Sequence, residues 1–320
     1  MDNLRNGGAV VRLDNGKVSF GQGAHTVQVL RGVSLSISSG EIVALVGESG
    51  SGKSTIARLI MRLYSPDEGR LYFHAEDVSR VQGRPLKRYR QSVQMVFQDP
   101  FASLNPAHSV ATILKRSATA MGIRNHQPNV LRNLLKQVGL VPAQNFLGKY
   151  PHELSGGQRQ RVAFARALAK QPELLIADEP VSMLDVSLRL GILNLMLELN
   201  EMFKMAILYI THDLASARYV AARIVVMYAG HVVEEGPATD VVDHPQHPYS
   251  KLLIQAAPDP SRRGSTEESL PSSRVSEPAQ QGCAFQERCL EAQERCQQLD
   301  PPTIHIDTHR SVKCFLFDPD

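Results

Sequence analysis

A glycine-rich turn between an apolar run and a helix-patterned segment constrains the fold more than any other feature of this chain. Residues Glu41 to Val46 read EIVALV, which is typical of a buried parallel strand. The turn GESGSGKS occupies Gly47 to Ser54, and the stretch Thr55 to Tyr64 then carries apolar residues at helical spacing. Those residues are Ile56, Leu59, Ile60 and Leu63. Pro66 and Gly69 are expected to end the helix. We therefore predict a strand, loop and helix unit of an α/β fold.

The turn also matches the pattern G-x-x-x-x-G-K-[ST], which binds the phosphates of a nucleotide. Its glycines let backbone N–H groups face inward, and the helix N-terminus behind them adds partial positive charge. Lys53 is expected to reach the β- and γ-phosphates, and Ser54 is expected to ligate Mg²⁺. The predicted nucleotide-binding residues here are Gly47, Glu48, Ser49, Gly50, Ser51, Gly52, Lys53, Ser54 and Thr55.

The rest of the chain alternates apolar strands with helices. Strands are predicted at Leu174–Asp178 and Ala206–His212, on either side of a helix near 187–204. Residues 99 to 170 read mostly helical. The helices expected there lie near 109–121, 128–138 and 158–170. This alternation predicts a mostly parallel sheet with helices on its faces.

Two acidic residues and a second pair of glycines lie downstream of the turn. Asp178 ends the strand LLIAD and Glu179 follows it, which suits a Mg²⁺-associated carboxylate beside a base for an attacking water. The segment LSGGQ, Leu154 to Gln158, precedes a helix-patterned stretch and so forms a second helix N-terminus that can bind an anion. One nucleotide needs only one phosphate loop, so the second anion site needs another explanation.

Together these motifs resemble the ATP-binding-cassette (ABC) ATPases, in which LSGGQ is the family signature and closes over the γ-phosphate of ATP held by a partner subunit. The resemblance implies that Gln98, in MVFQDP, senses the γ-phosphate and Mg²⁺, and that His212, in YITHDL, contacts the γ-phosphate. It implies that Phe20 stacks on adenine. The signature residues that would contact ATP are Ser155, Gly156, Gly157 and Gln158.

The segment Ser182 to Asp185 is similar to the D-loop of that family, which usually reads Ser-Ala-Leu-Asp, and Asp185 is expected at the nucleotide site. Met183 departs from the family pattern and places a bulkier side chain at the expected dimer seam. The fold that the resemblance implies is a P-loop NTPase ABC cassette. It comprises a RecA-like core, an antiparallel β subdomain and a helical signature subdomain at about 99–170, followed by a small cysteine-containing extension.

The reaction implied by the resemblance is hydrolysis of ATP with Mg²⁺. Glu179 would orient or deprotonate the water, with His212 and Gln98 as the other catalytic residues. The expected Mg²⁺ ligands are Ser54, Gln98 and Asp178. Because a chain with one phosphate loop and one signature cannot close its own site, a dimer is required. The second ATPase subunit is expected to be a paralogue, and a homodimer stays open.

Composition narrows the functional classes. The 320 residues carry 35 basic and 32 acidic side chains, a net charge of +3. Like charges do not form long runs, which argues against a nucleic-acid partner. The longest apolar stretches fall short of the ~20 residues that cross a bilayer, so no spanning segment is expected. LSGGQ argues against a kinase or GTPase. A non-transport ABC ATPase would show two cassettes or a coiled-coil insertion, so transport is favoured.

The C-terminal third points to one class of transporter. The segment His244 to Leu253, the phrase SVQMVFQDPFASLNP around Gln98 and the cysteine-rich tail resemble the oligopeptide/dipeptide/nickel importer subfamily, over roughly residues 10–316. The resemblance implies a peripheral ATPase on the cytoplasmic face of the inner membrane. It would energise peptide import through two permease subunits that receive substrate from an extracytoplasmic solute-binding protein. Nickel or another small solute is the alternative cargo.

These features divide the chain into four parts. They are an ABC ATPase domain at 10–243, the subfamily extension at 244–258, a linker at 259–282 and a four-cysteine module at 283–316. The linker contains few large aliphatic residues among many Ser, Pro, Glu and Arg residues, too few to offset the entropy of ordering it.

All four cysteines lie in the last part, at Cys283, Cys289, Cys296 and Cys314. A reducing cytosolic face disfavours disulfides, and the lack of C-x₂-C pairs disfavours a zinc ribbon. An unbroken helix would separate Cys289 from Cys296 by ~10.5 Å in rise, so the helix must break or the bound centre must be larger than one ion. The subfamily resemblance implies a [4Fe-4S] cluster on the four thiolates, and four free buried thiols are the alternative.

Overall fold

A computed structural model describes residues 8–21, 23–99, 103–119, 128–256 and 281–318. The predicted linker lies outside these residues apart from its last two positions. The strands are β1 (Ala9–Phe20), β2 (Val27–Ser38), β3 (Ile42–Val46), β4 (Glu68–Phe73), β5 (Glu76–Asp77), β6 (Val93–Val96), β7 (Leu174–Asp178), β8 (Ala206–Thr211), β9 (Arg223–Tyr228), β10 (His231–Pro237), β11 (Thr303–His305) and β12 (Ser311–Lys313). The α-helices are α1 (Lys53–Ile60), α2 (Gly83–Ser92), α4 (Val110–Thr119), α5 (Pro128–Gln137), α6 (Gln144–Leu147), α7 (Gly156–Leu168), α8 (Val186–Phe203), α9 (Leu214–Val220), α10 (Ala238–Asp243), α11 (Pro248–Gln255) and α12 (Arg295–Gln298). Short 3₁₀ helices lie at Gly23–His25, Pro151–Glu153, Gln286–Arg288 and Phe315–Phe317.

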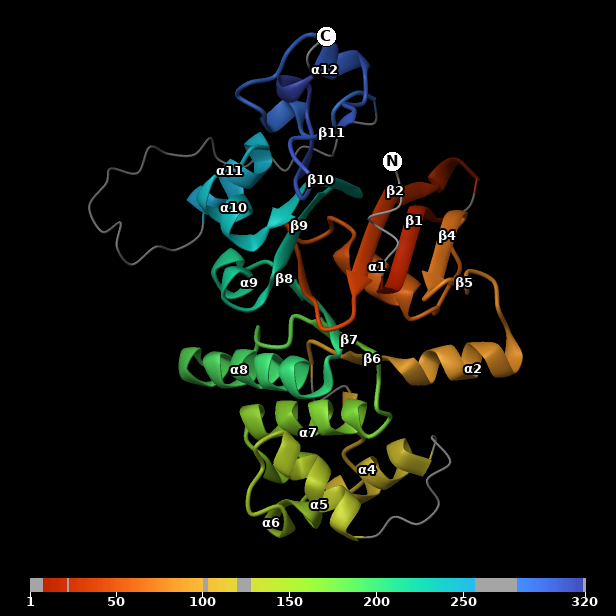
Figure 1. Ribbon diagram of the computed structural model, residues 1–320, viewed down its shortest axis with the longest axis vertical. Coiled ribbons are helices and arrows are strands. Elements are labelled where there is room, and N and C mark those ends of the chain that lie inside the picture. Colours follow the sequence, from red (N-terminus) through yellow and green to blue (C-terminus); the bar gives the residue numbers. More distant parts are fainter. Residues whose placement is uncertain (1–7, 22, 100–102, 120–127, 257–280, 319–320) are drawn as a thin grey trace, which may run out of the picture.

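Two sheets organise the molecule (Figure 1). The larger has the strand order β11-β12-β10-β9-β3-β8-β7-β6, and its strands from β9 to β6 are parallel. The smaller is antiparallel, with the order β2-β1-β4-β5. The predicted parallel sheet and antiparallel β subdomain are both confirmed.

Strand β3 is buried on both faces, which explains its unbroken apolar sequence. Ile42, Ala44 and Val46 belong to the core shared with α8, α9 and the helical subdomain. Val43 and Leu45 point to the opposite core, shared with α1 and the smaller sheet. Alternate side chains of a strand point to opposite faces, so a central strand covered on both sides has no polar positions.

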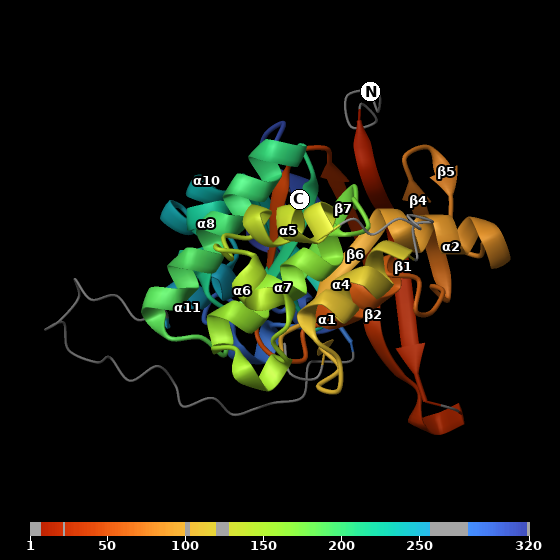
Figure 2. The same cartoon turned by 90° about the horizontal axis from the view of Figure 1, so that it is seen from below.

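The helical subdomain, α4 to α7, occupies the lower part of Figure 1, and Figure 2 views it from below. The predicted helices at 109–121, 128–138, 158–170 and 187–204 are confirmed with small shifts at their ends, and positions 120 and 121 lie outside the described residues. The helix after the glycine-rich turn was predicted too long. It ends at Ile60 rather than near Tyr64, because Arg62 adopts a left-handed backbone with φ 54°, and Leu63 stands 55% exposed.

The C-terminal region continues the core sheet. β12 pairs antiparallel with β10, placing Val312 opposite Glu234. The fully buried Glu234 carboxylate accepts hydrogen bonds from the Arg310 guanidinium at 2.7 Å and the His247 amide at 2.9 Å. Such a buried carboxylate is tolerated only where it is paired and hydrogen-bonded. The region around the cysteines is therefore held on the core by backbone pairing and by a buried ion pair.

The sequence left two alternatives for the segment between Cys289 and Cys296, a broken helix or a bound centre larger than one ion, and the structure shows a broken helix. A 3₁₀ turn ends at Arg288, and α12 begins only at Arg295. Across the described residues, no helix combines the length and apolar character needed to cross a bilayer.

Candidate nucleotide-binding site

The phosphate loop joins β3 to α1 at the carboxyl edge of the parallel strands. Gly47 has φ 153°, and a Cβ there would lie 2.2 Å from the carbonyl oxygen of Met227. Gly52 has φ 104° and immediately precedes Lys53, the first residue of α1. Only glycine fits both positions without moving the neighbouring backbone or side chains. These glycines therefore allow a tight turn at the N-terminus of α1, the kind of position where a backbone can bind an anion.

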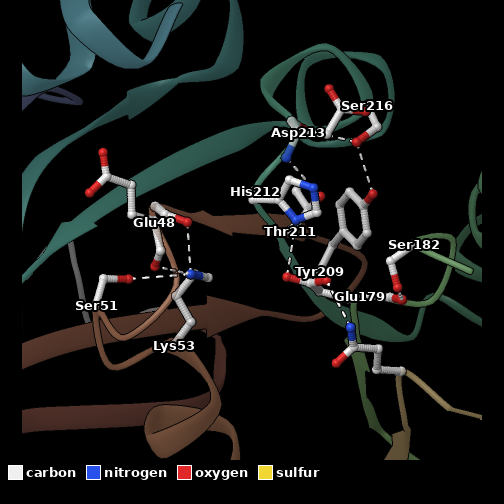
Figure 3. Close-up of polar contacts among 12 residues, drawn as sticks. Glu48, Ser51, Lys53, Glu179, Ser182, Tyr209, Thr211, His212, Asp213 and Ser216 are labelled. Carbon is white, nitrogen blue, oxygen red and sulfur yellow. Dashed lines mark hydrogen bonds and ion pairs between the residues drawn. The ribbon is translucent and has the colours of Figure 1, made fainter. Parts of the chain in front are cut away.

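The Lys53 side chain is buried within this turn, being only 6% exposed. Its ammonium donates to the carbonyl oxygens of Gly47 and Glu48, both at 2.7 Å, and to Ser51 Oγ at 3.3 Å (Figure 3). Burial lowers the pKa of Lys53, and the charge of Glu179 opposes that shift. The loop thus holds a buried cation, the kind of charge that pairs with a phosphate group.

Asp178 ends β7 beside the start of α1. Burial raises the pKa of its carboxyl group, while a hydrogen bond with Ser54 and the charge of Lys53 lower it. A carboxylate and a hydroxyl supply the oxygen ligands that Mg²⁺ prefers. Ser54 and Asp178 therefore fit the predicted metal role.

The three predicted catalytic residues meet at Glu179. The Oε1 oxygen of Glu179 lies 3.1 Å from His212 Nδ1, and its Oε2 accepts from Gln98 Nε2 at 3.2 Å. Glu179 adopts the left-handed backbone at φ 44°, and its amide donates to the carbonyl of Ile210 at 2.9 Å. The three side chains follow β6, β7 and β8, which are neighbours in the sheet. Parallel strands end at one edge, so these residues converge beside the phosphate loop.

The signature segment caps α7. Ser155 Oγ accepts from the Gln158 amide at 3.3 Å, and Gln158 Oε1 accepts from the Ser155 amide at 3.1 Å, a reciprocal capping box. The glycines between them lie close to the next segment: a Cβ on Gly156 would lie 3.3 Å from Leu184, just before α8, and one on Gly157 would lie 3.5 Å from Leu188 of α8. α7 lies in the helical half of the molecule and α1 in the other half (Figure 1). The signature and the phosphate loop therefore belong to different parts of one chain.

The segment Ser182 to Asp185, which is similar to a D-loop, connects Glu179 to α8. Ser182 Oγ donates to the Glu179 carbonyl at 3.0 Å, and Asp185 is the N-terminal capping residue of α8. Met183 is 62% exposed, so its bulk projects outward and does not disturb the core. Further exposed apolar residues follow it at Val186, Leu188 and Leu190.

Phe20, predicted to stack on adenine, stands at the end of β1 and is 45% exposed. Its ring meets the ring of Tyr64 edge-on, with centroids 5.5 Å apart. The Tyr64 hydroxyl donates to the carbonyl of Thr55 at 2.8 Å. The aromatic pair is therefore attached to the helix that begins at the phosphate loop.

Two contacts to the phosphate loop come from the C-terminal region, and the sequence analysis missed both. The Glu48 amide donates to the Tyr249 hydroxyl at 2.8 Å, and the Glu48 carboxylate accepts two hydrogen bonds from Arg288, at 2.8 and 2.9 Å. The segment HPQHPYS resembles the subfamily extension. Nothing in its pattern pairs Tyr249 with position 48.

The four cysteines, at 283, 289, 296 and 314, are unbridged and line one small cavity together with His247 and Phe285. The amides of Phe285, Glu291 and Leu316 donate to Cys283, Cys289 and Cys314 respectively, and the Gln293 amide donates to Cys296 Sγ at 3.4 Å. Burial and the neighbouring thiols raise the pKa of Cys289 to about 11. Among the described residues, no three Cys, His, Asp or Glu side chains are close enough to hold a single metal ion.

A parallel sheet bearing a phosphate loop, a strand-end Asp-Glu pair and a separate LSGGQ-capped helix defines an ATPase of the ABC cassette class. Residues 30–182 match the family model described as "ABC transporter", and residues 233–296 match "Oligopeptide/dipeptide transporter, C-terminal region". The chain belongs to the ABC transporter family, as an ATP-binding subunit of its oligopeptide/dipeptide group.

Individual relatives agree with this assignment. The oligopeptide transport ATP-binding protein AppF of Bacillus subtilis is 42% identical over 298 residues, covering 91% of this chain and 90% of the relative. YkfD of the same organism, named a putative oligopeptide transport ATP-binding protein, is 38% identical and covers 94% and 93%. Among solved structures, cbiO1 from Clostridium perfringens, part of an ABC transporter complex, gives a TM-score of 0.65 at 26% identity, covering 74% of this chain and 92% of that one. A dimer of the cassette MJ0796 bound to ADP and Pi gives 0.61 at 30% identity, covering 71% and 98%.

Proposed function

We propose that this chain hydrolyses ATP to energise the import of peptides through separate permease subunits. The observation that carries the proposal is the convergence of Glu179, His212 and Gln98 beside the buried Lys53. The peptide cargo is supported by the match of residues 233–296 to the oligopeptide/dipeptide region and by the names of the relatives.

In the proposed reaction, the phosphate loop and Lys53 bind the β- and γ-phosphates, and Phe20 stacks on the base. Ser54, Asp178 and Gln98 would hold Mg²⁺, which would neutralise charge on the phosphates. Glu179 accepts the proton of a water that attacks the γ-phosphorus as the bond to the β-phosphate breaks. His212 and Gln98 hold the Glu179 carboxylate in place from either side.

The active form is proposed to be a dimer of ATPase subunits in which each signature, residues 155–158, completes the site on the partner's phosphate loop. The exposed apolar residues beside the signature support this, since monomers rarely leave such a group open to water. The group consists of Met183, Val186, Leu188 and Leu190. We infer that the second subunit is a paralogue and that Asp185 lies at the shared seam.

The chain would act on the cytoplasmic face of the membrane, held there by two permeases that receive peptide from an extracytoplasmic binding protein. Purification of the tagged full chain from membranes, followed by identification of the bound subunits, tests this assignment. Recovery of two permease chains is the expected result. Recovery of ribosomes or DNA in their place would show a non-transport ATPase. Recovery of permeases specific for nickel would show that nickel, and not peptide, is the cargo.

We further propose that the four cysteines hold a [4Fe-4S] cluster. Four sulfurs around one cavity, each with an amide donor, form a donor set suited to such a cluster, whereas the spacing does not suit one ion. Protein purified without oxygen is expected to contain iron and to absorb broadly near ~400 nm. Colourless, iron-free protein would leave four free thiols as the correct account.

A further inference from the structure

Arg288 attaches the cysteine region directly to the phosphate loop. Its two terminal nitrogens donate to the two oxygens of the Glu48 carboxylate at 2.8 and 2.9 Å. The guanidinium also lies over the rings of Tyr228 and Phe285, 5.7 and 5.6 Å from their centroids. Bidentate pairing and ring stacking fix a guanidinium in one orientation. The arginine is therefore a rigid clamp on the side chain of Glu48.

Tyr249 holds the same loop residue through its backbone. Its hydroxyl accepts from the Glu48 amide at 2.8 Å, while its ring is fully buried. That ring packs against Tyr228 and Phe285, with centroids 4.7 and 5.5 Å apart. The backbone and the carboxylate of Glu48 are thus both held from outside the cassette core.

The position of Glu48 makes this clamp relevant to phosphate binding. Its carbonyl oxygen lies 2.7 Å from Lys53 Nζ, and burial lowers the pKa of Lys53 while the negative charge of Glu48 partly opposes that shift. In Figure 3 the Glu48 carboxylate points away from the Lys53 ammonium. Because Lys53 Nζ lies 2.7 Å from the carbonyl oxygen of Glu48 itself, a released Glu48 side chain is only a few bond lengths from the ammonium. A carboxylate paired with Lys53 would compete with the phosphates of a nucleotide.

We propose that Arg288 and Tyr249 are positioning residues for nucleotide binding, which keep the Glu48 carboxylate turned away from Lys53 so that the ammonium stays available to phosphate. The C-terminal region then contributes to nucleotide binding by orienting a residue of the phosphate loop. The inference rests on the proposed role of Lys53 in binding ATP. It makes the affinity for MgATP depend on two residues, Tyr249 and Arg288, that lie outside the cassette motifs.

The test measures equilibrium binding of MgATP to the full chain, by displacement of a fluorescent ATP analogue. Four proteins are compared with the wild type: Arg288→Gln, Glu48→Gln, the double variant and Lys251→Ala. Lys251 is the matched control, because its exposed ion pair with Glu291, at 3.2 Å, also joins α11 to the cysteine region without touching the phosphate loop. Thermal unfolding of each protein separates lost affinity from lost fold.

Arg288→Gln is expected to weaken MgATP binding about tenfold, since it frees a carboxylate beside Lys53. The double variant is expected to bind MgATP within about twofold of Glu48→Gln, because the competing carboxylate is absent from both proteins. Lys251→Ala should bind like the wild type, and Glu48→Gln serves as the reference for the double variant. A purely structural role for Arg288 would not predict rescue by a second substitution at the same contact.

Unchanged affinity in Arg288→Gln, or a double variant as weak as the single one, would overturn the inference. If Arg288→Gln does not fold, Arg288→Lys takes its place and should bind MgATP with intermediate affinity, because an ammonium keeps the charge without the two-point grip. Equal affinity of Arg288→Lys and the wild type would then contradict the clamp. A wild-type chain that binds no ATP would instead refute the proposed function itself.

Discussion

His212 Nδ1 lies 3.1 Å from the Oε1 oxygen of Glu179, so a strand-end histidine and a strand-end carboxylate share one hydrogen bond. Gln98 donates to the other carboxylate oxygen, at 3.2 Å. The carboxylate is thereby fixed at the edge of the sheet from which the phosphate loop also emerges. A base that is already oriented has less entropy to lose when a water molecule and a phosphate arrive.

Replacing Glu179 with Gln should leave ATP binding nearly unchanged and slow hydrolysis at least about 100-fold, because the amide cannot accept the proton of the water. Phosphate release and ATP affinity are measured on the same preparation. The matched control is Glu173→Gln, since Glu173 has an equivalent contact with His74, at 2.8 Å, away from the site. Phosphate release at the wild-type rate from Glu179→Gln would refute the base assignment.

Replacing His212 with Ala should slow hydrolysis by about 10- to 100-fold, because Glu179 loses one of its two side-chain contacts. ATP affinity should change much less than the rate. The control is His74→Ala, which removes the exposed partner of Glu173. If His212→Ala and His74→Ala reduce the rate of ATP hydrolysis equally, His212 has no specific role in the reaction.

Val186→Glu should prevent ATP-dependent dimerisation, because it places a carboxylate in the exposed apolar group beside the signature. Sedimentation is measured with ATP in the Glu179→Gln background, because a dimer that does not hydrolyse its ATP is not expected to dissociate through hydrolysis. Met202→Glu is the control, since Met202 is 60% exposed near the other end of the same helix. A Val186→Glu protein that dimerises as readily as the Met202→Glu protein would place the interface elsewhere.

Acid should destabilise the chain through His247. Burial lowers the pKa of this histidine from 6.5 to about 3, and its Nδ1 accepts from the Tyr249 amide at 3.0 Å. The unfolded chain therefore takes up a proton near pH 6.5 that the folded chain refuses until about pH 3, so the stability is complete above pH 6.5 and falls as the pH drops.

Between pH 7 and pH 5 the expected loss from this histidine is about 2 kcal/mol of unfolding free energy. Asn at position 247 keeps a capping acceptor but does not titrate. Denaturant unfolding of the wild type and His247→Asn at both pH values measures the difference. Parallel pH dependence in the two proteins would show that His247 takes up its proton as easily in the folded chain as in the unfolded one.

The parts of the site that the sequence predicts are those carried by short, local patterns. The phosphate loop, LSGGQ and the Asp-Glu pair are each contiguous, and each lies at a strand end or a helix start where its chemistry needs it. Gln98 and His212 came from the family resemblance. In the structure, the parallel strands β6 and β8 place these two residues at one edge of the sheet, because neighbouring parallel strands all end there.

The contacts that the sequence does not predict join distant segments. Glu48 meets Tyr249 and Arg288 across 201 and 240 residues, and each of these side chains is an ordinary surface or core type when taken alone. The pairing of β12 with β10 is similarly hidden, because a three-residue strand has no recognisable alternation. The premature end of α1 depends on the left-handed backbone of Arg62, for which the apolar spacing gives no sign.

The most direct test of the account is ATP-driven uptake of a labelled oligopeptide into vesicles that contain this chain with the permeases and ATPase subunit that co-purify with it. The account predicts uptake with the wild-type chain and none when Glu179→Gln replaces it, with the same amount of chain on the vesicles. Steady ATP hydrolysis without peptide uptake in the wild-type vesicles, or full uptake with Glu179→Gln, would contradict it.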